Sequence, residues 1–187
     1  EVTYEKPATW GVKVTVRNKT TNATHSYTIT TANWPGDPVT VDFGGFCNTG
    51  NDFNDKRELA AFFSNISKET TGGTTDAFSG LPNSHSQWGL YFKEEIANLP
   101  YHGTSSDYPA VGGKSYKGRG PIQLSWNYNY GRFSDFLYAD KNVLLNNPSE
   151  LATNGVTSFK SAIWFWMTPS CPKPSCHQVM QGTFDES

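Results

Sequence analysis

The stretch KSYKGRGPIQLSWNYNYG, residues Lys114–Gly131, is the most informative part of this sequence. Its first half contains Gly118, Gly120 and Pro121, which favour a tight and rigid turn of the backbone. Its second half combines short hydrogen-bonding side chains with aromatic rings: Gln123, Ser125, Asn127, Tyr128, Asn129 and Tyr130. Uncharged donors and acceptors beside aromatic faces match a neutral, hydroxyl-rich ligand such as a sugar. The alternative from composition alone is a glycine-rich turn followed by an aromatic, buried helix.

Two further segments flank this stretch and belong to the same pattern. KRELAAFFSNISKETTGG (Lys56–Gly73) lies upstream, and LLNNPSELATNGVTSFKSAIWFWMTP (Leu144–Pro169) lies downstream. In this order the three segments resemble the motifs of glycoside hydrolase family 19, the plant-type chitinases. The resemblance runs from about Asp52 to about Gln181. It implies a mainly α (α+β) fold with a lysozyme-like, bilobal helical domain.

The first 45 residues predict a small β-rich segment ahead of that domain. Apolar and polar residues alternate around Val12–Val16, Tyr27–Thr31 and Val39–Phe43, which is typical of strands. One interpretation is a small appendage in which Trp10 and Trp34 stack on a polysaccharide. The other is a set of strands that covers the core and packs both tryptophans inside, because three strands alone bury little. Residues 46–187 are then the family 19 catalytic domain, short at its C-terminal end relative to the family.

Three helices are predicted from apolar periodicity. Asn54–Glu69 places Leu59, Phe62, Phe63 and Ile66 on one face, with Asp52 or Asn54 available to cap its start. An amphipathic helix passes through Phe133, Phe136 and Leu137. A final helix at about Ser149–Met167 carries six residues that we assign to the core: Leu151, Val156, Phe159, Ile163, Trp164 and Phe165.

Charge and hydropathy exclude several classes of partner. The 187 residues include 15 basic and 17 acidic ones, with a formal net charge of −2. No block of like charge indicates binding to nucleic acid or to an anionic membrane. The most apolar stretch, Ala162–Met167, is far too short to span a bilayer. We therefore expect neither nucleic acid nor a membrane as partner, and we expect a monomer.

Sequons and cysteines fit a secreted product. Asn18, Asn22 and Asn65 each begin an Asn-X-Ser/Thr triplet, although Asn65 lies inside a predicted helix. The chain opens on Glu1, as a processed chain would. We expect a secreted protein, either extracellular or vacuolar.

The number of cysteines limits the disulfides that can form, and the cysteine and histidine spacings do not match a metal site. With three cysteines, at most one disulfide forms within the chain: Cys171 with Cys176, or Cys47 with either of them. CPKPSC is not a zinc spacing, and the four histidines are scattered along the chain. No metal and no other cofactor is expected.

The resemblance implies two catalytic carboxyl groups. Glu69, in SKETTGG, matches the family's general acid, and Glu95, in WGLYFKEEI, matches its general base, with Glu94 as the exposed neighbour. The helix dipole disfavours negative charge at the end of the helix where Glu69 lies, which suits a proton donor. Ser125 matches the serine that orients the attacking water. Seven further residues match substrate-binding positions: Thr71, Tyr101, Tyr108, Gln123, Tyr128, Asn129 and Lys173.

The family cleaves β-1,4-linked N-acetylglucosamine polymers with inversion at the anomeric carbon. Inversion needs two carboxyl groups on the order of 6.5–9.5 Å apart, so that a water fits beside the base. One carboxyl group protonates the leaving oxygen while the other removes a proton from that water. The chain is therefore expected to be a secreted, endo-acting chitinase in defence or chitin turnover, with chitin or chitooligosaccharides as partner.

Several positions depart from the family pattern. Lys68 replaces the usual histidine immediately before the acid, and Thr74 replaces a tryptophan. Tyr91, His102 and Ala110 stand where plant members commonly have cysteines. The family also continues beyond PKPSCH into a segment that supplies more of the cleft. Either this chain is a natural short form, or the remainder lies elsewhere or was lost. A short cleft predicts fewer sugar subsites.

Two competing functions follow from these departures. The first is a chitin-binding protein with little or no turnover, favoured by Lys68 and by the missing C-terminal segment. Retention of both Glu69 and Glu95 argues against it, because a lectin needs no such pair. The second is a hydrolase of peptidoglycan, since the wider lysozyme-like superfamily shares this arrangement. The close match of the central stretch to chitinases disfavours that alternative.

Overall fold

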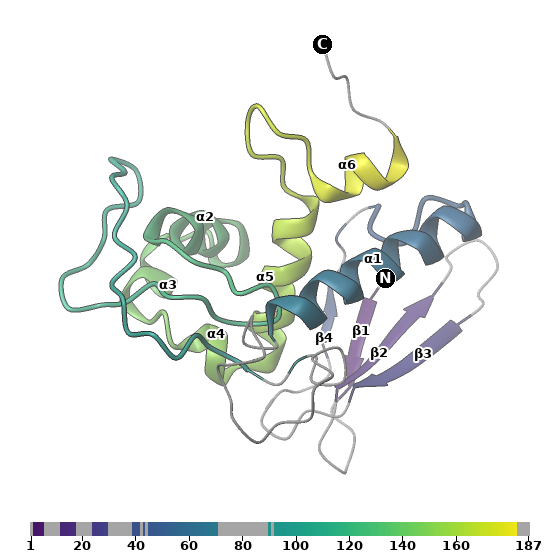
Figure 1. Ribbon diagram of the computed structural model, residues 1–187, viewed down its shortest axis with the longest axis horizontal. Helices are drawn as coiled ribbons and strands as arrows, with labels where there is room; N and C mark the ends of the chain where they lie inside the picture. The colour runs from purple at the N-terminus through teal and green to yellow at the C-terminus, as the bar shows by residue number, and fades with distance from the viewer. Residues whose placement is uncertain are drawn as a thin grey trace. The chain divides into compact units, whose positions relative to one another are not determined.

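The computed structural model of the chain is mainly helical with one small sheet (Figure 1). It describes residues 2–5, 12–17, 24–29, 39–41, 43, 45–70, 90 and 92–182. The chain divides into two compact units: Glu1–Asn65 with Ile163–Ser187 is unit 1, and Ile66–Ala162 is unit 2. The predicted division into a β-rich segment and a catalytic domain at residue 45 stays a prediction.

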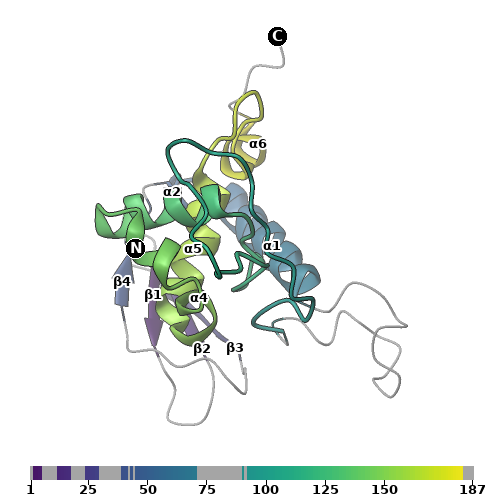
Figure 2. The same ribbon diagram turned by 90° about the vertical axis from the view of Figure 1, so that its left-hand side faces the viewer.

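The N-terminal strands form one antiparallel sheet in the order β3-β2-β1-β4. Its members are β1 (Val2–Glu5), β2 (Val12–Arg17), β3 (Thr24–Ile29) and β4 (Val39–Val41), which lie side by side in Figure 1 and Figure 2. The three predicted strands are confirmed. Strand β1 was not predicted, because its four residues are too short to show a clear alternation. Trp10 and Trp34 lie outside the described residues, so both interpretations of this segment stay open.

Helix α1 (Asp52–Glu69) confirms the predicted long helix, and its apolar stripe is buried. Leu59, Phe62 and Ile66 are 8%, 2% and 1% exposed, whereas Phe63 is half-buried. The cap differs from the prediction. Asn51 Oδ1 accepts hydrogen bonds from the backbone N–H groups of residues 53 and 54. The helix therefore begins two residues earlier than predicted, because an asparagine side chain satisfies its free N–H groups.

The core of unit 1 is built around Phe62 and a buried carboxylate. The Phe62 ring meets the rings of Phe46 and Trp166 edge to face, at centroid distances of 5.1 and 5.5 Å. Beside them Glu58 is fully buried. It accepts hydrogen bonds from Trp166 Nε1 (2.9 Å) and from the Cys47 backbone N–H (3.0 Å), and His177 Nδ1 lies 2.7 Å from it. A buried carboxylate is tolerated here because its oxygens are fully hydrogen-bonded.

The predicted final helix is wrong as a single element. It divides into α4 (Glu150–Thr153) and α5 (Gly155–Met167), with Asn154 in an extended conformation between them. Asn154 Oδ1 accepts hydrogen bonds from the backbone N–H groups of residues 156 and 157, which caps a new helix. Asparagine favours such a cap over a helix interior, so apolar periodicity alone missed the break.

The predicted core of this region is largely confirmed, with one exception. Leu151, Phe159, Ile163 and Trp164 are buried and Val156 is half-buried, but Phe165 is 42% exposed. Its neighbour Trp166 is buried instead, because its indole N–H reaches Glu58.

The remaining helices are short. Helix α2 (Asn127–Tyr138) is the predicted amphipathic helix, and it packs against α3 (Asn142–Asn146). Phe133 is fully buried, as predicted, but Phe136 is 56% exposed. Helix α6 (Cys176–Gln181) begins with a capping box formed by Ser175 and Gln178.

Two observations limit the chemistry of the described part of the chain. None of its helices is both long and apolar enough to cross a membrane. It also holds no group of three or more histidine, cysteine or acidic side chains arranged to bind a metal ion. The three cysteines are free thiols in this structure.

Candidate active site

The glycine-rich stretch folds into a tight loop that begins at Gly118. The backbone groups of Arg119 and Leu124 exchange two hydrogen bonds, of 3.2 and 2.9 Å. Gly120 and Gln123 have φ angles of 76° and 52°. The side chain of Ser158 would lie 3.3 Å from a Cβ atom at Gly120. This close approach and the positive φ explain why a glycine occupies the position.

Backbone hydrogen bonds place the segment around Glu95 against this loop. Glu95 N–H donates to Gly118 O at 2.8 Å, and Gly120 N–H donates to Lys93 O at 2.8 Å. Glu94 forms an isolated β-bridge with Arg119. The backbone of Glu95 is therefore held by main-chain pairing with the loop.

The C-terminal end of α1 is joined to the same segment through Thr70. Thr70 O accepts the Phe92 N–H at 3.0 Å, and Thr70 Oγ1 accepts the Leu90 N–H at 2.5 Å. The threonine is fully buried, and its hydroxyl also donates to Ile66 O at 2.7 Å. Glu69, the last residue of α1, is exposed and directly precedes this junction. Thr70 was missed from the sequence, because its role is apparent only from the chain that packs on it.

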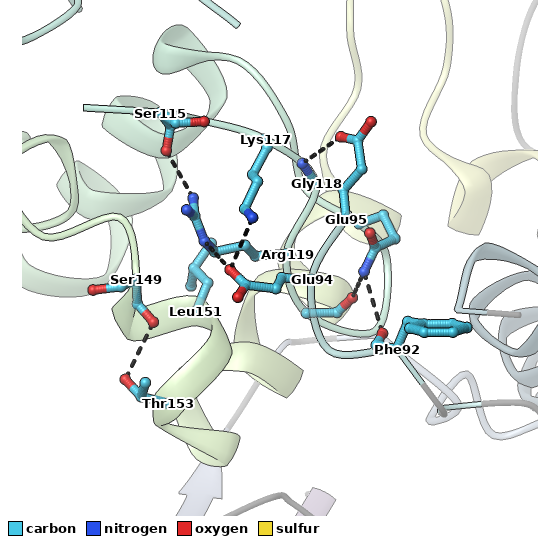
Figure 3. Close-up of polar contacts among 12 residues, drawn as sticks. Phe92, Glu94, Glu95, Ser115, Lys117, Gly118, Arg119, Ser149, Leu151 and Thr153 are labelled. Carbon is cyan, nitrogen blue, oxygen red and sulfur yellow. Dashed lines mark hydrogen bonds and ion pairs between the residues drawn. The ribbon is translucent and has the colours of Figure 1, made fainter. Parts of the chain in front are cut away.

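The two adjacent glutamates have different surroundings, and their carboxylates point in different directions in Figure 3. Glu95 Oε1 accepts a hydrogen bond from the Tyr101 hydroxyl at 2.8 Å, and Oε2 accepts one from Gly118 N–H at 3.3 Å. The hydrogen bond from Tyr101 raises the pKa of that tyrosine. Glu95 is half-buried, and no ion pair is recorded for it among the described residues.

Glu94 is held by two cations. Its Oε2 lies 3.1 Å from Arg119 Nε and 3.6 Å from Lys117 Nζ. Arg119 is 6% exposed, and it also donates to Ser115 O (2.8 Å) and to the Tyr130 hydroxyl (3.1 Å). Glu94 was expected to be an exposed neighbour of the base. Its side chain is 39% exposed, and it is also part of a charged network that the sequence did not predict.

Three predicted site residues stabilise the loop from within. Ser125 Oγ donates to Gln123 O at 2.9 Å. Gln123 Nε2 donates to Gly120 O at 3.0 Å and lies 3.5 Å from Phe92 O. Asn129 Nδ2 donates to Ser125 O at 2.9 Å. Gln123 and Ser125 therefore lie on the same loop as Gly118, one of the two partners of Glu95, and Asn129 bonds to that loop from α2.

An aromatic cluster borders Glu95. Tyr101 meets Trp126 edge to face at 5.2 Å, and Trp126 stacks on Tyr128 at 6.1 Å with an interplanar angle of 12°. Trp126 is 40% exposed, which leaves part of the indole open to solvent. It was not among the predicted binding residues. Its place between Ser125 and Asn127 was the only signal in the sequence.

Tyr108 lies against α2. A Cβ atom at Gly131 would come within 2.4 Å of the Tyr108 ring, so the ring packs directly on that glycine. Burial and a hydrogen bond with Asp135 raise the pKa of Tyr108. Its loop is held by the fully buried Asn127, whose amide bonds to both Gly103 and Tyr108. No described contact joins Tyr108 to Glu95 or Ser125.

The family model described as "Chitinase class I" matches residues 14–187. The chain belongs to glycoside hydrolase family 19. The match includes Glu69, Glu95 and the whole loop that surrounds Glu95.

Curated relatives and a solved structure agree with the family assignment. The chain is 51% identical over 146 residues to acidic endochitinase WIN6 of Populus trichocarpa, which covers 78% of this chain and 41% of that protein. It is 52% identical over 141 residues to inactive chitinase-like protein 1 of Hevea brasiliensis, covering 75% and 43%. The crystal structure of a family GH19, class IV chitinase from Zea mays matches with a TM-score of 0.55 and 31% identity, covering 74% and 56%.

The chain thus spans 41% and 43% of the length of these two curated relatives. Within this family 19 chain, unit 2 holds Glu69, Tyr101, Gln123, Ser125 and Glu95. Lys173 belongs to unit 1, where its backbone pairs with Ser170. Thr71 lies outside the described residues. The roles assigned to all of these residues stay predictions.

Proposed function

We propose that this family 19 chain hydrolyses β-1,4-linked N-acetylglucosamine polymers by an inverting mechanism, and that it acts within the polymer. The observation that carries the proposal is that the adjacent carboxylates of Glu94 and Glu95 have different ion-pair and hydrogen-bond partners. Glu94 is neutralised by Arg119 and Lys117, while Glu95 accepts hydrogen bonds only from uncharged donors among the described residues and stays partly open to solvent. A general base needs a carboxylate that is oriented but not consumed by an ion pair.

In this proposal Glu95 removes a proton from the attacking water and Ser125 helps to orient that water. Glu95 and Ser125 are linked through the loop 118–125, because Gly118 bonds to Glu95 and Gln123 accepts from Ser125. A loop closed by its own hydrogen bonds keeps both groups in place before the substrate arrives. The other carboxyl group, Glu69, protonates the leaving oxygen. Its placement as the exposed last residue of α1 leaves its carboxyl group accessible to a substrate.

In this proposal the amide and aromatic side chains around Glu95 bind the sugar. Exposed aromatic surface such as that of Trp126 matches the C–H faces of a pyranose ring. We assign sugar binding to the predicted residues of the family pattern: Thr71, Tyr101, Tyr108, Gln123, Tyr128, Asn129 and Lys173. For Tyr101 this assignment concerns the aromatic ring, because its hydroxyl donates to Glu95.

A second candidate function is binding of chitin without turnover. Two observations favour it: Lys68 precedes the proposed acid, and the Hevea brasiliensis relative is named an inactive chitinase-like protein at 52% identity. Both catalytic glutamates are present here, so we place this candidate second.

The test is hydrolysis of a chitin hexamer, with the anomers of the products resolved by NMR at early times. The expected result is release of the α-anomer by the wild type, and loss of turnover by roughly 10²–10⁴-fold in Glu69→Gln and in Glu95→Gln. Glu94→Gln is the matched control, because it makes the same change one residue away from the proposed base. Binding of the hexamer without cleavage by the wild type would favour the second candidate.

We also propose that the protein is secreted. The support is the three sequons at Asn18, Asn22 and Asn65. Expression through a eukaryotic secretory pathway, followed by enzymatic removal of N-glycans, is expected to lower the mass of the product. An unchanged mass would remove this support.

A further inference from the structure

We propose that Tyr101 is a positioning residue for Glu95, and that its hydroxyl does not serve as a sugar-binding group. This inference rests on the proposed function, because it assigns a role relative to the proposed base. The aromatic ring and the hydroxyl of Tyr101 then have separate tasks: the ring packs on Trp126, and the hydroxyl holds the carboxylate.

The hydrogen bonds of Glu95 carry the argument. In the part of the chain that the structure describes, each carboxylate oxygen has one donor: the Tyr101 hydroxyl on Oε1 at 2.8 Å and the Gly118 N–H on Oε2 at 3.3 Å. The contact with Gly118 is the longer of the two, and it is made by backbone that also pairs with Glu95 N–H. Because each oxygen has its own donor, rotation of the carboxylate about the Cγ–Cδ bond is restricted. The Tyr101 hydroxyl is the only side-chain donor recorded for Glu95 among the described residues.

The backbone of Tyr101 is held in a conformation that few tyrosines adopt. Its φ angle is 52°, in the left-handed region. Hydrogen bonds on both sides keep it there: Tyr116 N–H donates to Pro100 O at 3.0 Å, and Asn127 N–H donates to Tyr101 O at 3.4 Å. A non-glycine residue in this region persists when its surroundings enforce it, and such residues concentrate at functional sites.

The aromatic contact fixes the direction of the side chain. The Tyr101 ring meets the Trp126 ring edge to face, at 5.2 Å and an interplanar angle of 81°. Trp126 in turn stacks on Tyr128. The ring of Tyr101 is thus aimed by its neighbours, and its hydroxyl arrives at Glu95 without depending on a bound ligand.

The hydroxyl also keeps its proton in the range where the reaction is expected to run. The hydrogen bond to Glu95 raises the pKa of Tyr101 above its ordinary value, so the group remains a donor through neutral and moderately alkaline pH. A donor that persists over this range holds the base in the same orientation throughout.

The experiment compares Tyr101→Phe with Tyr138→Phe. Both changes remove a tyrosine hydroxyl that donates to a glutamate, but Tyr138 is the last residue of α2 and its partner is Glu150, the first residue of α4. With a chitin hexamer, Tyr101→Phe is expected to lower kcat by about 10–100-fold with KM changed less than about twofold, because misplacement of a reacting group costs turnover. Tyr138→Phe is expected to keep both constants. Tyr101→His, which offers a ring N–H donor, is expected to recover part of the lost kcat.

Any of three kinetic results would overturn the inference. One is a Tyr101→Phe enzyme with the kcat of the wild type. Another is a rise of KM in Tyr101→Phe with kcat unchanged, since that pattern belongs to a group that binds the substrate uniformly. A kcat of Tyr101→His that is no higher than the kcat of Tyr101→Phe would also overturn the inference.

A second measurement separates this inference from the proposed function. In protein labelled with ¹³C at the glutamate carboxyl carbons, the resonance absent from Glu95→Gln identifies Glu95. That resonance is expected to move in Tyr101→Phe and to stay in place in Tyr138→Phe, whether or not chitin is cleaved. An inactive wild type with this shift contradicts the proposed function and preserves the contact. An unmoved resonance in Tyr101→Phe overturns the inference.

Discussion

At the scale of single residues, neighbours in sequence have opposite environments. Glu94 and Glu95 are chemically identical and adjacent, yet one faces two cations and the other faces a hydroxyl and a backbone N–H. The β-bridge between Glu94 and Arg119 causes the difference, because successive side chains of an extended segment point to opposite sides.

Replacement of Glu94 by Gln is expected to lower stability more than activity. The change removes the charge that neutralises Arg119 and Lys117, and Arg119 is largely buried. Glu94 is 39% exposed, so the cost is expected to be about 1–2 kcal/mol, below that of a fully buried pair. Urea unfolding checks the stability and hexamer hydrolysis checks the turnover. A loss of turnover as large as that of Glu95→Gln, with stability unchanged, would contradict the assignment of the base.

At the scale of elements, the site depends on how α1 ends and how the segment after Leu90 docks on it. The backbone carbonyl and the hydroxyl of Thr70 accept two N–H groups from this segment. The connection joins the helix that ends in Glu69 to the segment that carries Glu95.

We expect Thr70→Val to weaken this connection. Valine keeps the shape but leaves the buried Leu90 N–H without its acceptor, which costs about 1–3 kcal/mol. Because residues 92–95 follow directly, kcat is expected to fall along with stability. The measurement pairs urea unfolding with hexamer hydrolysis. Thr70→Ser retains the hydroxyl and is the control. If Thr70→Val and Thr70→Ser lower stability and kcat equally, the Thr70 hydroxyl does not make this connection.

The break between α4 and α5 gives a second prediction at this scale. Asn154→Ala removes the acceptor for two backbone N–H groups at the start of α5 and is expected to cost about 1 kcal/mol. Asn146→Ala is the control, because Asn146 is exposed and only bonds back within α3. Thermal unfolding of the two variants measures the difference. A smaller effect at Asn154 than at Asn146 would contradict the capping role.

At the scale of the whole molecule, tyrosines with raised pKa values make stability depend on alkaline pH. Loss of contact with water is the main cause that raises the pKa of four tyrosines: Tyr108, Tyr116, Tyr130 and Tyr138. For Tyr101 the main cause is its hydrogen bond to Glu95. For Tyr138 the value rises from 10.0 to about 12. Burial also raises the pKa of the Cys47 thiol.

The sign of the effect follows from proton binding. Above about pH 10 the unfolded chain loses its tyrosine protons while the folded chain keeps them, so the unfolded state binds fewer protons. The free energy of unfolding is therefore expected to be independent of these groups below about pH 9 and to fall as the pH rises through 10 towards 12. Urea unfolding at pH 8, 10 and 11 measures this, and Tyr138→Phe is expected to show a shallower fall than the wild type. A stability that rises with pH in this range would be incompatible with the buried hydroxyls.

The sequence by itself determined the features that depend on local pattern. The stripe Leu59, Phe62 and Ile66 specified α1, the alternation of apolar and polar residues specified three strands, and the stretch around Gly118 with its two flanking segments specified the family. These signals are local because periodicity and turn chemistry act over a few residues.

The tertiary structure alone decided which groups meet. The partners of Glu95 are Tyr101 and Gly118, six and 23 positions away, and the indole of Trp166 reaches Glu58 across 108 positions. The exposure of Phe165 and the burial of its neighbour Trp166 were likewise set by tertiary packing. Such contacts join segments that a local pattern treats separately, and their free energy is gained only when the chain has closed the loops between them.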